Sequence, residues 1–202
     1  MGDRNIILLT WAEPAKAYQA FSRIRDVDFG GVTVEGSAVV ERQSDGRLKV
    51  ADGQDNELGL GTLGGSVLGT LIGLLGGPVG ALLGFAGGAL FGSIFDVGRA
   101  ADSDSVVGEM SRALPPGHAG LLIEAEEVSP SGIDQFAADD GATVLRRPED
   151  EVLDEIAAAE DAAEAAAWAA DEKMRAAKRE ERKEKREERV AKLKARLHGD
   201  RS

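Results

Sequence analysis

The sequence has no cysteine, which excludes a disulfide framework and every metal site built on thiolates. Its two histidines, His118 and His198, do not have the spacing of zinc-binding pairs. Aromatic residues make up only 4% of the 202 residues, so a core must rely on alanine and aliphatic side chains. The apolar run at residues 6–9 is shorter than the core of a signal peptide, and we expect no signal peptide.

Candidates for chemistry are correspondingly few. Ser129 precedes a proline and is better explained as a helix cap than as a nucleophile. The loop carboxylates, such as Asp102 and Asp139, lack the ligand series of a calcium-binding loop. We therefore expect no catalytic residue, no metal and no cofactor, and we expect that the protein is not an enzyme.

Charge is distributed very unevenly along the chain. The formal net charge is −12, yet residues 149–172 hold ten acidic residues and no Lys or Arg, giving −10. Residues 173–202 hold thirteen Lys or Arg and six acidic residues, giving +7. This separation says more about partners than the global charge does.

The apolar pattern outside the centre of the chain predicts two βαβ units. Two such units make a ferredoxin-like α+β sandwich, which is the fold we expect. In the first unit a helix begins at Pro14, and in the second a helix begins at Ser129-Pro130. The predicted strands are residues 6–10, 32–42, 119–124 and 142–147, with a return strand at 47–51 after the turn Asp45-Gly46 and a short helix at 105–114.

The centre of the chain is a glycine-rich segment, residues 58–95, that holds no charged residue over 38 positions. Its glycines recur every four residues in two sets, which predicts two helices that each present a smooth packing face. The turn between them is predicted at Gly76-Gly77-Pro78. The two sets are Gly61, Gly65, Gly69, Gly73 and Gly77, then Gly76, Gly80, Gly84, Gly88 and Gly92.

Two interpretations of this hairpin stay open. Each leg would span ~27 Å, just short of the ~30 Å hydrocarbon core of a bilayer. A membrane hairpin would place both ends of the segment in the cytoplasm, because Arg42, Arg47, Lys49 and Arg99 flank it. The alternative is a cytoplasmic protein whose hairpins bury one another in an oligomer.

From Pro148 onward the sequence predicts one long helix. Trp168 is the one bulky residue of its alanine-rich part and favours packing against a neighbouring helix. The basic half could contact an anionic surface, but interleaved glutamates argue against nucleic acid. The candidate contact residues are Lys178, Arg179, Arg182, Lys183, Lys185, Arg186, Arg189, Lys192, Lys194 and Arg196.

Several motifs together resemble a bacterial family, domain of unknown function 1269, whose members are often described as membrane or stress-related proteins. The resemblance covers residues 5–148 and implies a ferredoxin-like domain with an inserted glycine-zipper hairpin. It brings no catalytic residues. The motifs are Ile7-Leu8-Leu9-Thr10, Lys16-Ala17-Tyr18, Ala38-Val39-Val40-Glu41-Arg42, Asp45-Gly46-Arg47, Leu74-Leu75-Gly76-Gly77-Pro78-Val79-Gly80, Ala113-Leu114-Pro115-Pro116-Gly117 and Val144-Leu145-Arg146-Arg147-Pro148.

The sequence therefore predicts four regions: residues 1–57 and 96–147 as halves of the α+β domain, 58–95 as the hairpin, and 148–202 as the charged helix. Our first functional hypothesis is a non-enzymatic, self-associating inner-membrane protein. The second is a soluble structural protein that forms a homo-oligomer through the hairpin and the charged helix. The third is a ligand-sensing module with an apolar pocket that Tyr18 and Phe21 would line.

Overall fold

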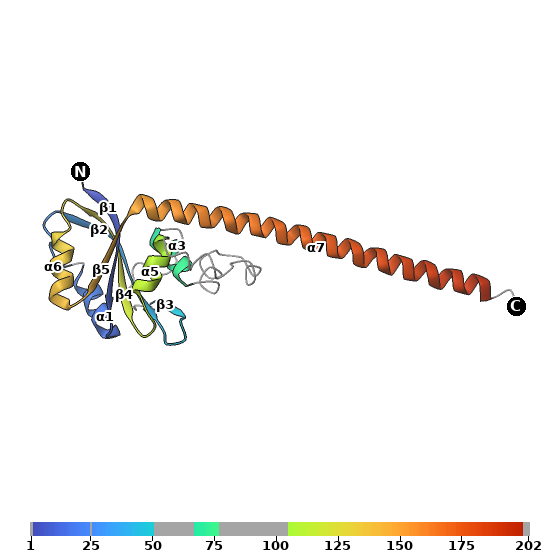
Figure 1. Ribbon diagram of the computed structural model, residues 1–202, viewed down its shortest axis with the longest axis horizontal. Coiled ribbons are helices and arrows are strands. Elements are labelled where there is room, and N and C mark those ends of the chain that lie inside the picture. Colours follow the sequence, from blue (N-terminus) through green and yellow to red (C-terminus); the bar gives the residue numbers. More distant parts are fainter. Residues whose placement is uncertain (1, 25, 51–66, 77–104, 200–202) are drawn as a thin grey trace. The chain divides into compact units, whose positions relative to one another are not determined.

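The computed structural model describes residues 2–24, 26–50, 67–76 and 105–199 (Figure 1). The chain divides into two compact units, Met1–Glu160 and Asp161–Ser202. The first unit contains a sheet with helices on both faces, and the second continues a helix that begins in the first. We describe each unit by itself.

The sheet of the first unit has five antiparallel strands in the order β3-β2-β4-β1-β5. Ile6, Ile7, Leu8 and Leu9 of β1 are all fully buried, because this strand lies inside the sheet and both faces are covered. The strands are β1 (Asp3–Trp11), β2 (Val32–Arg42), β3 (Leu48–Val50), β4 (Ala119–Glu127) and β5 (Thr143–Pro148).

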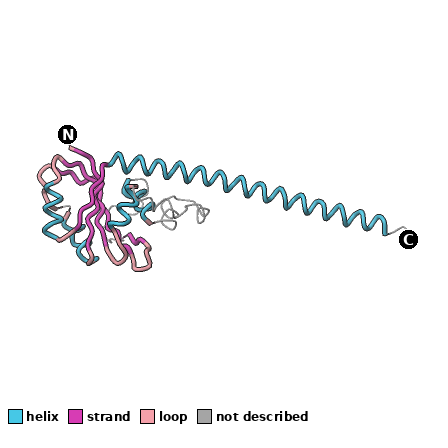
Figure 2. The backbone as a smooth tube through the Cα atoms, in the orientation of Figure 1, coloured by secondary structure: helices cyan, strands magenta, loops and turns pink. Residues whose placement is uncertain are grey.

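One face of the sheet is covered by α1 (Pro14–Arg23) and α6 (Ser131–Asp140), as Figure 2 shows. Pro14 occupies the first turn of α1, where its missing N–H has no helical partner to lose. The α6 helix ends at Gly141, whose φ of 68° suits a residue without a Cβ. Phe29 and Phe136 close this core edge to face, with ring centroids 5.5 Å apart.

The other face is covered by α3 (Val67–Leu75), α5 (Val106–Ala113) and the first turns of α7 (Glu149–Gly199). Leu71 of α3 and Met110 of α5 pack with Val152 of α7 over Leu8. The Ser105 hydroxyl caps α5 by accepting a hydrogen bond from the Gly108 N–H at 2.9 Å. The domain is therefore a mixed α+β structure in which a helix of the glycine-rich segment forms part of the core.

Much of the predicted secondary structure is confirmed. The strand at residues 32–42, the helix that begins at Pro14 and the long C-terminal helix are all present. The α6 helix begins at Ser131 and its N-cap is Pro130, not Ser129; the Ser129 hydroxyl still accepts a hydrogen bond from the Ser131 N–H at 3.4 Å and lies 3.0 Å from the Ser131 hydroxyl. The predicted return strand at 47–51 is shorter, at Leu48–Val50.

The predicted hairpin is described only at residues 67–76, where α3 is helical and Gly76 donates its N–H to the Ile72 carbonyl at 3.0 Å. Among the described residues, no helix is both long and apolar enough to cross a membrane. The remaining predicted packing and turn residues lie outside the described residues: Gly61, Gly65, Gly77, Pro78, Gly80, Gly84, Gly88 and Gly92.

Candidate functional site

By residue type His118 is a candidate for chemistry, and the structure shows a local contact for its ring. His118 lies in a turn, with its ring nitrogen Nδ1 3.3 Å from the Pro116 carbonyl oxygen. No group of His, Asp and Glu in the described part of the chain is arranged to hold a metal. The site that remains is the charged surface of α7.

The basic residues predicted as surface contacts occupy one side of α7. At about 100° per residue, all bases from Arg175 to Lys192 fall within about 200° of the helix circumference. The five glutamates of the same stretch occupy the remaining arc. These basic side chains are exposed: Lys178, Arg179, Arg182, Lys183, Lys185, Arg186, Arg189 and Lys192. The side chains of Lys194 and Arg196 lie outside the described residues.

The acidic part of the second unit uses the same side of the helix. Asp161, Glu164, Asp171 and Glu172 fall in the arc that the bases occupy later. One side of α7 is therefore first negative and then positive along its length. The opposite side between residues 163 and 177 consists mainly of alanine, with Lys173 and Met174.

Exposed apolar side chains accompany these charges. Trp168 is 69% exposed, and its indole N–H donates to the Glu164 carboxylate at 3.4 Å. Val190 and Leu193 are 43% and 58% exposed. Single exposed apolar side chains are common on protein surfaces, so these three are informative only together with the charge pattern around them.

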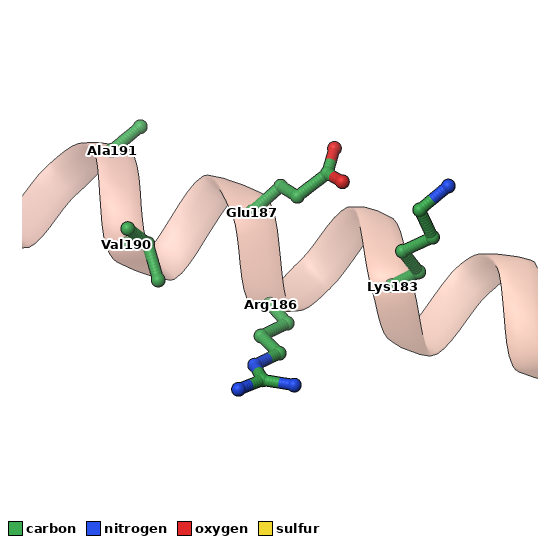
Figure 3. Close-up of a pocket in the computed structure, with 5 residues that line it drawn as sticks. All are labelled: Lys183, Arg186, Glu187, Val190 and Ala191. Atoms are coloured by element: carbon green, nitrogen blue, oxygen red, sulfur yellow. The ribbon is translucent and has the colours of Figure 1, made fainter.

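Figure 3 shows five residues of this helix that border an open hollow. Arg186 and Val190 point to one side, whereas Lys183, Glu187 and Ala191 point to the other. A single helix cannot enclose a small molecule, because it supplies only one wall. This surface suits an extended partner.

The ion pairs that the structure shows in the second unit are short-range pairs within α7. Arg175 and Asp171 lie 2.7 Å apart, and Lys183 and Glu180 lie 3.6 Å apart. The Lys185 ammonium lowers the pKa of the Glu181 carboxyl. Such exposed pairs stabilise a helix only weakly and leave its charges accessible.

The described glycines of the hairpin belong to α3 and to the residue that follows it. Gly73 is buried, whereas Gly69 and Gly76 are partly exposed. The opposite sides of the same helix bury Leu68, Leu71, Ile72 and Leu75 against the sheet. A Cβ on Gly36 of β2 would lie 3.2 Å from a Leu68 methyl carbon, so glycine there permits the close approach of α3.

The ligand-sensing hypothesis required a pocket lined by Tyr18 and Phe21. Tyr18 is 37% exposed, and its hydroxyl lies 3.4 Å from a Glu41 carboxylate oxygen. Burial and the Glu41 charge raise the pKa of Tyr18. An open hollow on the described surface lies instead beside β2, where Ile24, Val27, Phe29 and Val32 are among its lining residues.

Sequence reasoning missed the structural role of Arg42. Its guanidinium donates to the carbonyls of Leu114 at 2.7 Å, Gly46 at 3.1 Å and Leu75 at 3.4 Å, and to the Ser111 hydroxyl at 3.1 Å. Burial lowers the pKa of Arg42. The sequence contained one usable signal, an arginine at the end of a predicted core strand.

A second missed group is the pair formed by Arg146 and Glu127. The guanidinium makes two hydrogen bonds to the carboxylate, at 2.7 and 3.2 Å, and Glu127 is only 3% exposed. Asn5 also donates to Glu127, at 3.0 Å, and Asp134 accepts from Arg146 at 2.7 Å. These contacts join β1, β4, β5 and α6, so this cluster is structural.

The fold and the surface together define a mixed α+β domain followed by a long charged helix. The chain belongs to the family described as "Protein of unknown function (DUF1269)", whose sequence model matches residues 62–166, just over half of the chain. The match confirms the family resemblance and extends into α7, while the motifs before residue 62 lie outside it. No curated protein and no solved structure matches the chain.

Proposed function

We propose that this protein is a non-enzymatic, self-associating structural protein in which the α7 helix joins copies of the chain. The observation that carries the proposal is the side of α7 on which Trp168 and a block of acids precede a block of exposed bases. An isolated helix this polar has little to stabilise it. Its separated acidic and basic blocks are complementary to those of a second copy of the helix.

We further propose that the domain is ferredoxin-like. The four long strands follow the order β2-β4-β1-β5, and α1 and α6 lie on the same face. The chain order β1-α1-β2 and β4-α6-β5 makes two βαβ units, and this arrangement supports the proposal. The short β3 strand and helices α3 and α5 then belong to the insertion between the two units.

A membrane role through residues 58–95 is the second candidate, and the run of 38 uncharged residues favours it. In this proposal the glycine-rich segment enters the bilayer with both ends on the cytoplasmic side. The four large side chains of α3 lie against the sheet in this conformation, so insertion requires α3 to leave that site. The basic part of α7 would add attraction to anionic lipid.

Two measurements on the full-length protein separate these candidates. Sedimentation velocity over a wide range of protein concentration should show an assembly larger than one chain, and a monomer at every concentration would contradict the proposal. Flotation with vesicles tests the second candidate, because a bilayer protein floats with neutral and anionic vesicles alike. A protein that remains at the bottom of both gradients excludes the membrane role.

A further inference from the structure

One narrow face of α7 in the second unit has a symmetric arrangement of side chains. At about 100° per residue, this face spans about 100° of the helix circumference, with Ala165 and Arg182 at its edges and eight further exposed residues between Asp161 and Arg186. We refer to these eight as the charged face. Its residues are Asp161, Glu164, Trp168, Glu172, Arg175, Arg179, Lys183 and Arg186.

We propose that the charged face binds the charged face of a second copy of this chain, with the two helices antiparallel. This inference rests on the proposed function, since it names the partner and the orientation of the self-association. It concerns only residues of the second unit, which supplies the whole of this face.

A single two-fold axis between Lys173 and Met174 places each of these residues opposite a complementary one. Asp161 then lies opposite Arg186, Glu164 opposite Lys183, and Glu172 opposite Arg175. The symmetry repeats each pair, so six oppositely charged pairs form across the interface. Packed helices lie about 8–10 Å apart, a distance that these long side chains span.

Trp168 has a matching partner in the same register. It lies opposite Arg179, and both side chains are exposed in the single chain. An arginine over an indole ring gains from the electron-rich face of the ring. In the proposed dimer, Arg179 of the second copy would cover Trp168, which is exposed in the single chain.

The reversal of charge along the face identifies the partner. An anionic membrane or nucleic acid would attract the part from Arg175 to Arg186 but repel Asp161 and Glu164. An antiparallel second copy satisfies both parts at once. A parallel copy in register would instead oppose acid to acid and base to base.

Contacts within the helix are compatible with this arrangement. Arg175 lies 2.7 Å from Asp171, and Lys183 lies 3.6 Å from Glu180, but the side chains of Arg175 and Lys183 remain 70% and 63% exposed. Each can therefore approach a second carboxylate. Arginine has five N–H donors, and lysine has three.

The dependence of association on salt tests the orientation. Charges are screened over about 10 Å at 0.1 M salt and about 3 Å at 1 M, so attraction between opposite charges weakens as salt rises. We expect sedimentation equilibrium of the full-length protein to give a dimer at low salt and a higher dissociation constant at high salt. A parallel pairing would show the opposite dependence.

Two charge-reversal variants test the pairs. D161R/E164R makes the acidic end of the face basic, and K183E/R186E makes the basic end acidic. Each change turns four attractive pairs of the dimer into repulsive ones, so we expect the dissociation constant to rise about tenfold or more. An equimolar mixture of the two variants, and the variant that carries all four substitutions, should recover the affinity.

The matched control is E184R/E188R, which changes the net charge by as much as D161R/E164R and leaves the Lys183–Glu180 pair in place. Both residues lie on the opposite side of the helix, so the dissociation constant should stay within about twofold of the unmodified protein. All substituted residues are exposed, and far-UV circular dichroism confirms that α7 is retained.

Three results would overturn the inference. A protein that is monomeric throughout removes the proposed function together with it. An assembly unaffected by salt and by both charge reversals leaves the proposed function standing, with another surface making the contact. Association that appears only on anionic vesicles identifies a lipid surface as the partner.

Discussion

Arg42 reaches from the end of β2 to the end of α5, where its Nε–H donates to the Leu114 carbonyl at 2.7 Å. The same guanidinium donates to the Leu75 carbonyl at the end of α3. Carbonyls at helix ends have no partner within the helix, and the helix dipole favours a cation there. One side chain therefore holds two inserted helices against the sheet.

Replacing Arg42 with Met should destabilise the protein strongly. The change leaves a set of partly buried carbonyls without a donor, and each loss costs about 1–3 kcal/mol. We expect the free energy of unfolding to fall by about 2–4 kcal/mol in urea titrations. Arg47→Met is the control, because Arg47 is an exposed residue of the neighbouring turn and its loss should change stability by about 0.5 kcal/mol or less. Equal effects of the two substitutions would contradict the role of Arg42.

Replacing Arg146 with Met should also be costly, for a different reason. Glu127 would remain buried without its cationic partner, and breaking a buried ion pair in this way costs about 3–5 kcal/mol. Arg23→Met is the comparison, since the Arg23–Asp140 pair is half exposed and should be worth about 1 kcal/mol or less. Chemical denaturation of both variants measures the difference, and a small loss for Arg146→Met would show that water or Asn5 compensates Glu127.

The sequence predicted those elements whose pattern is local. Residues 32–42 alternate in polarity and Pro14 starts a helix, so the strand is found with the expected bounds and the helix with the expected start. The long helix after Pro148 follows from its alanine content in the same way. Position on a helix is also local information, which is why the basic side of α7 could be expected from the spacing of its charges.

Contacts between distant residues could not be predicted in this way. Arg42 and Leu114 are 72 positions apart, and nothing in either local pattern links them. The uncharged segment shows the same limit, because apolar residues at helical spacing suit a bilayer, a second helix or a sheet equally well. Leu68 and Leu71 lie on the sheet, a partner that periodicity cannot identify.

Glu124 provides a prediction about pH. Burial, together with the nearby carboxylates of Glu149 and Glu35, raises the pKa of Glu124, while Arg4 opposes this shift. A carboxyl whose pKa is higher in the folded state binds protons more readily when folded, so its ionisation opposes folding. Its contribution to stability therefore declines as the pH rises through the pKa of the unfolded state and then through that of the folded state.

Replacing Glu124 with Gln should thus increase the free energy of unfolding at pH 7. The gain should shrink as the pH is lowered, because protonated Glu124 is already neutral in the unmodified protein. Urea titrations at several pH values measure both effects. Glu126→Gln is the control, since an amide oxygen can still accept the hydrogen bond from the Gly2 N–H. A gain from Glu124→Gln that does not depend on pH would show that charge is not its cause.

Gly132 lies where α6 approaches the backbone before β2. A Cβ at this position would lie 2.5 Å from the Phe29 carbonyl oxygen and 3.0 Å from the Phe29 Cβ. Because a backbone atom cannot move aside as a side chain can, Gly132→Ala should lower the free energy of unfolding by about 1–3 kcal/mol despite the better helix propensity of alanine. Gln135→Ala on the exposed side of α6 should be nearly neutral in thermal melts. A neutral Gly132→Ala would mean that α6 can move away from Phe29.

Trp168 reports directly on whether the charged face is covered. The protein has two tryptophans, and Trp11 is only 2% exposed whereas Trp168 is 69% exposed, so a change of environment on association should come from Trp168. We expect the fluorescence maximum to shift to shorter wavelength at low salt and high protein concentration, since burial removes the indole from water. Trp168→Phe should abolish the shift while Trp11 continues to emit, and sedimentation run in parallel shows whether the variant still associates. If the unmodified protein forms a dimer without any shift, Trp168 lies outside the contact and the proposed register of the two helices is wrong.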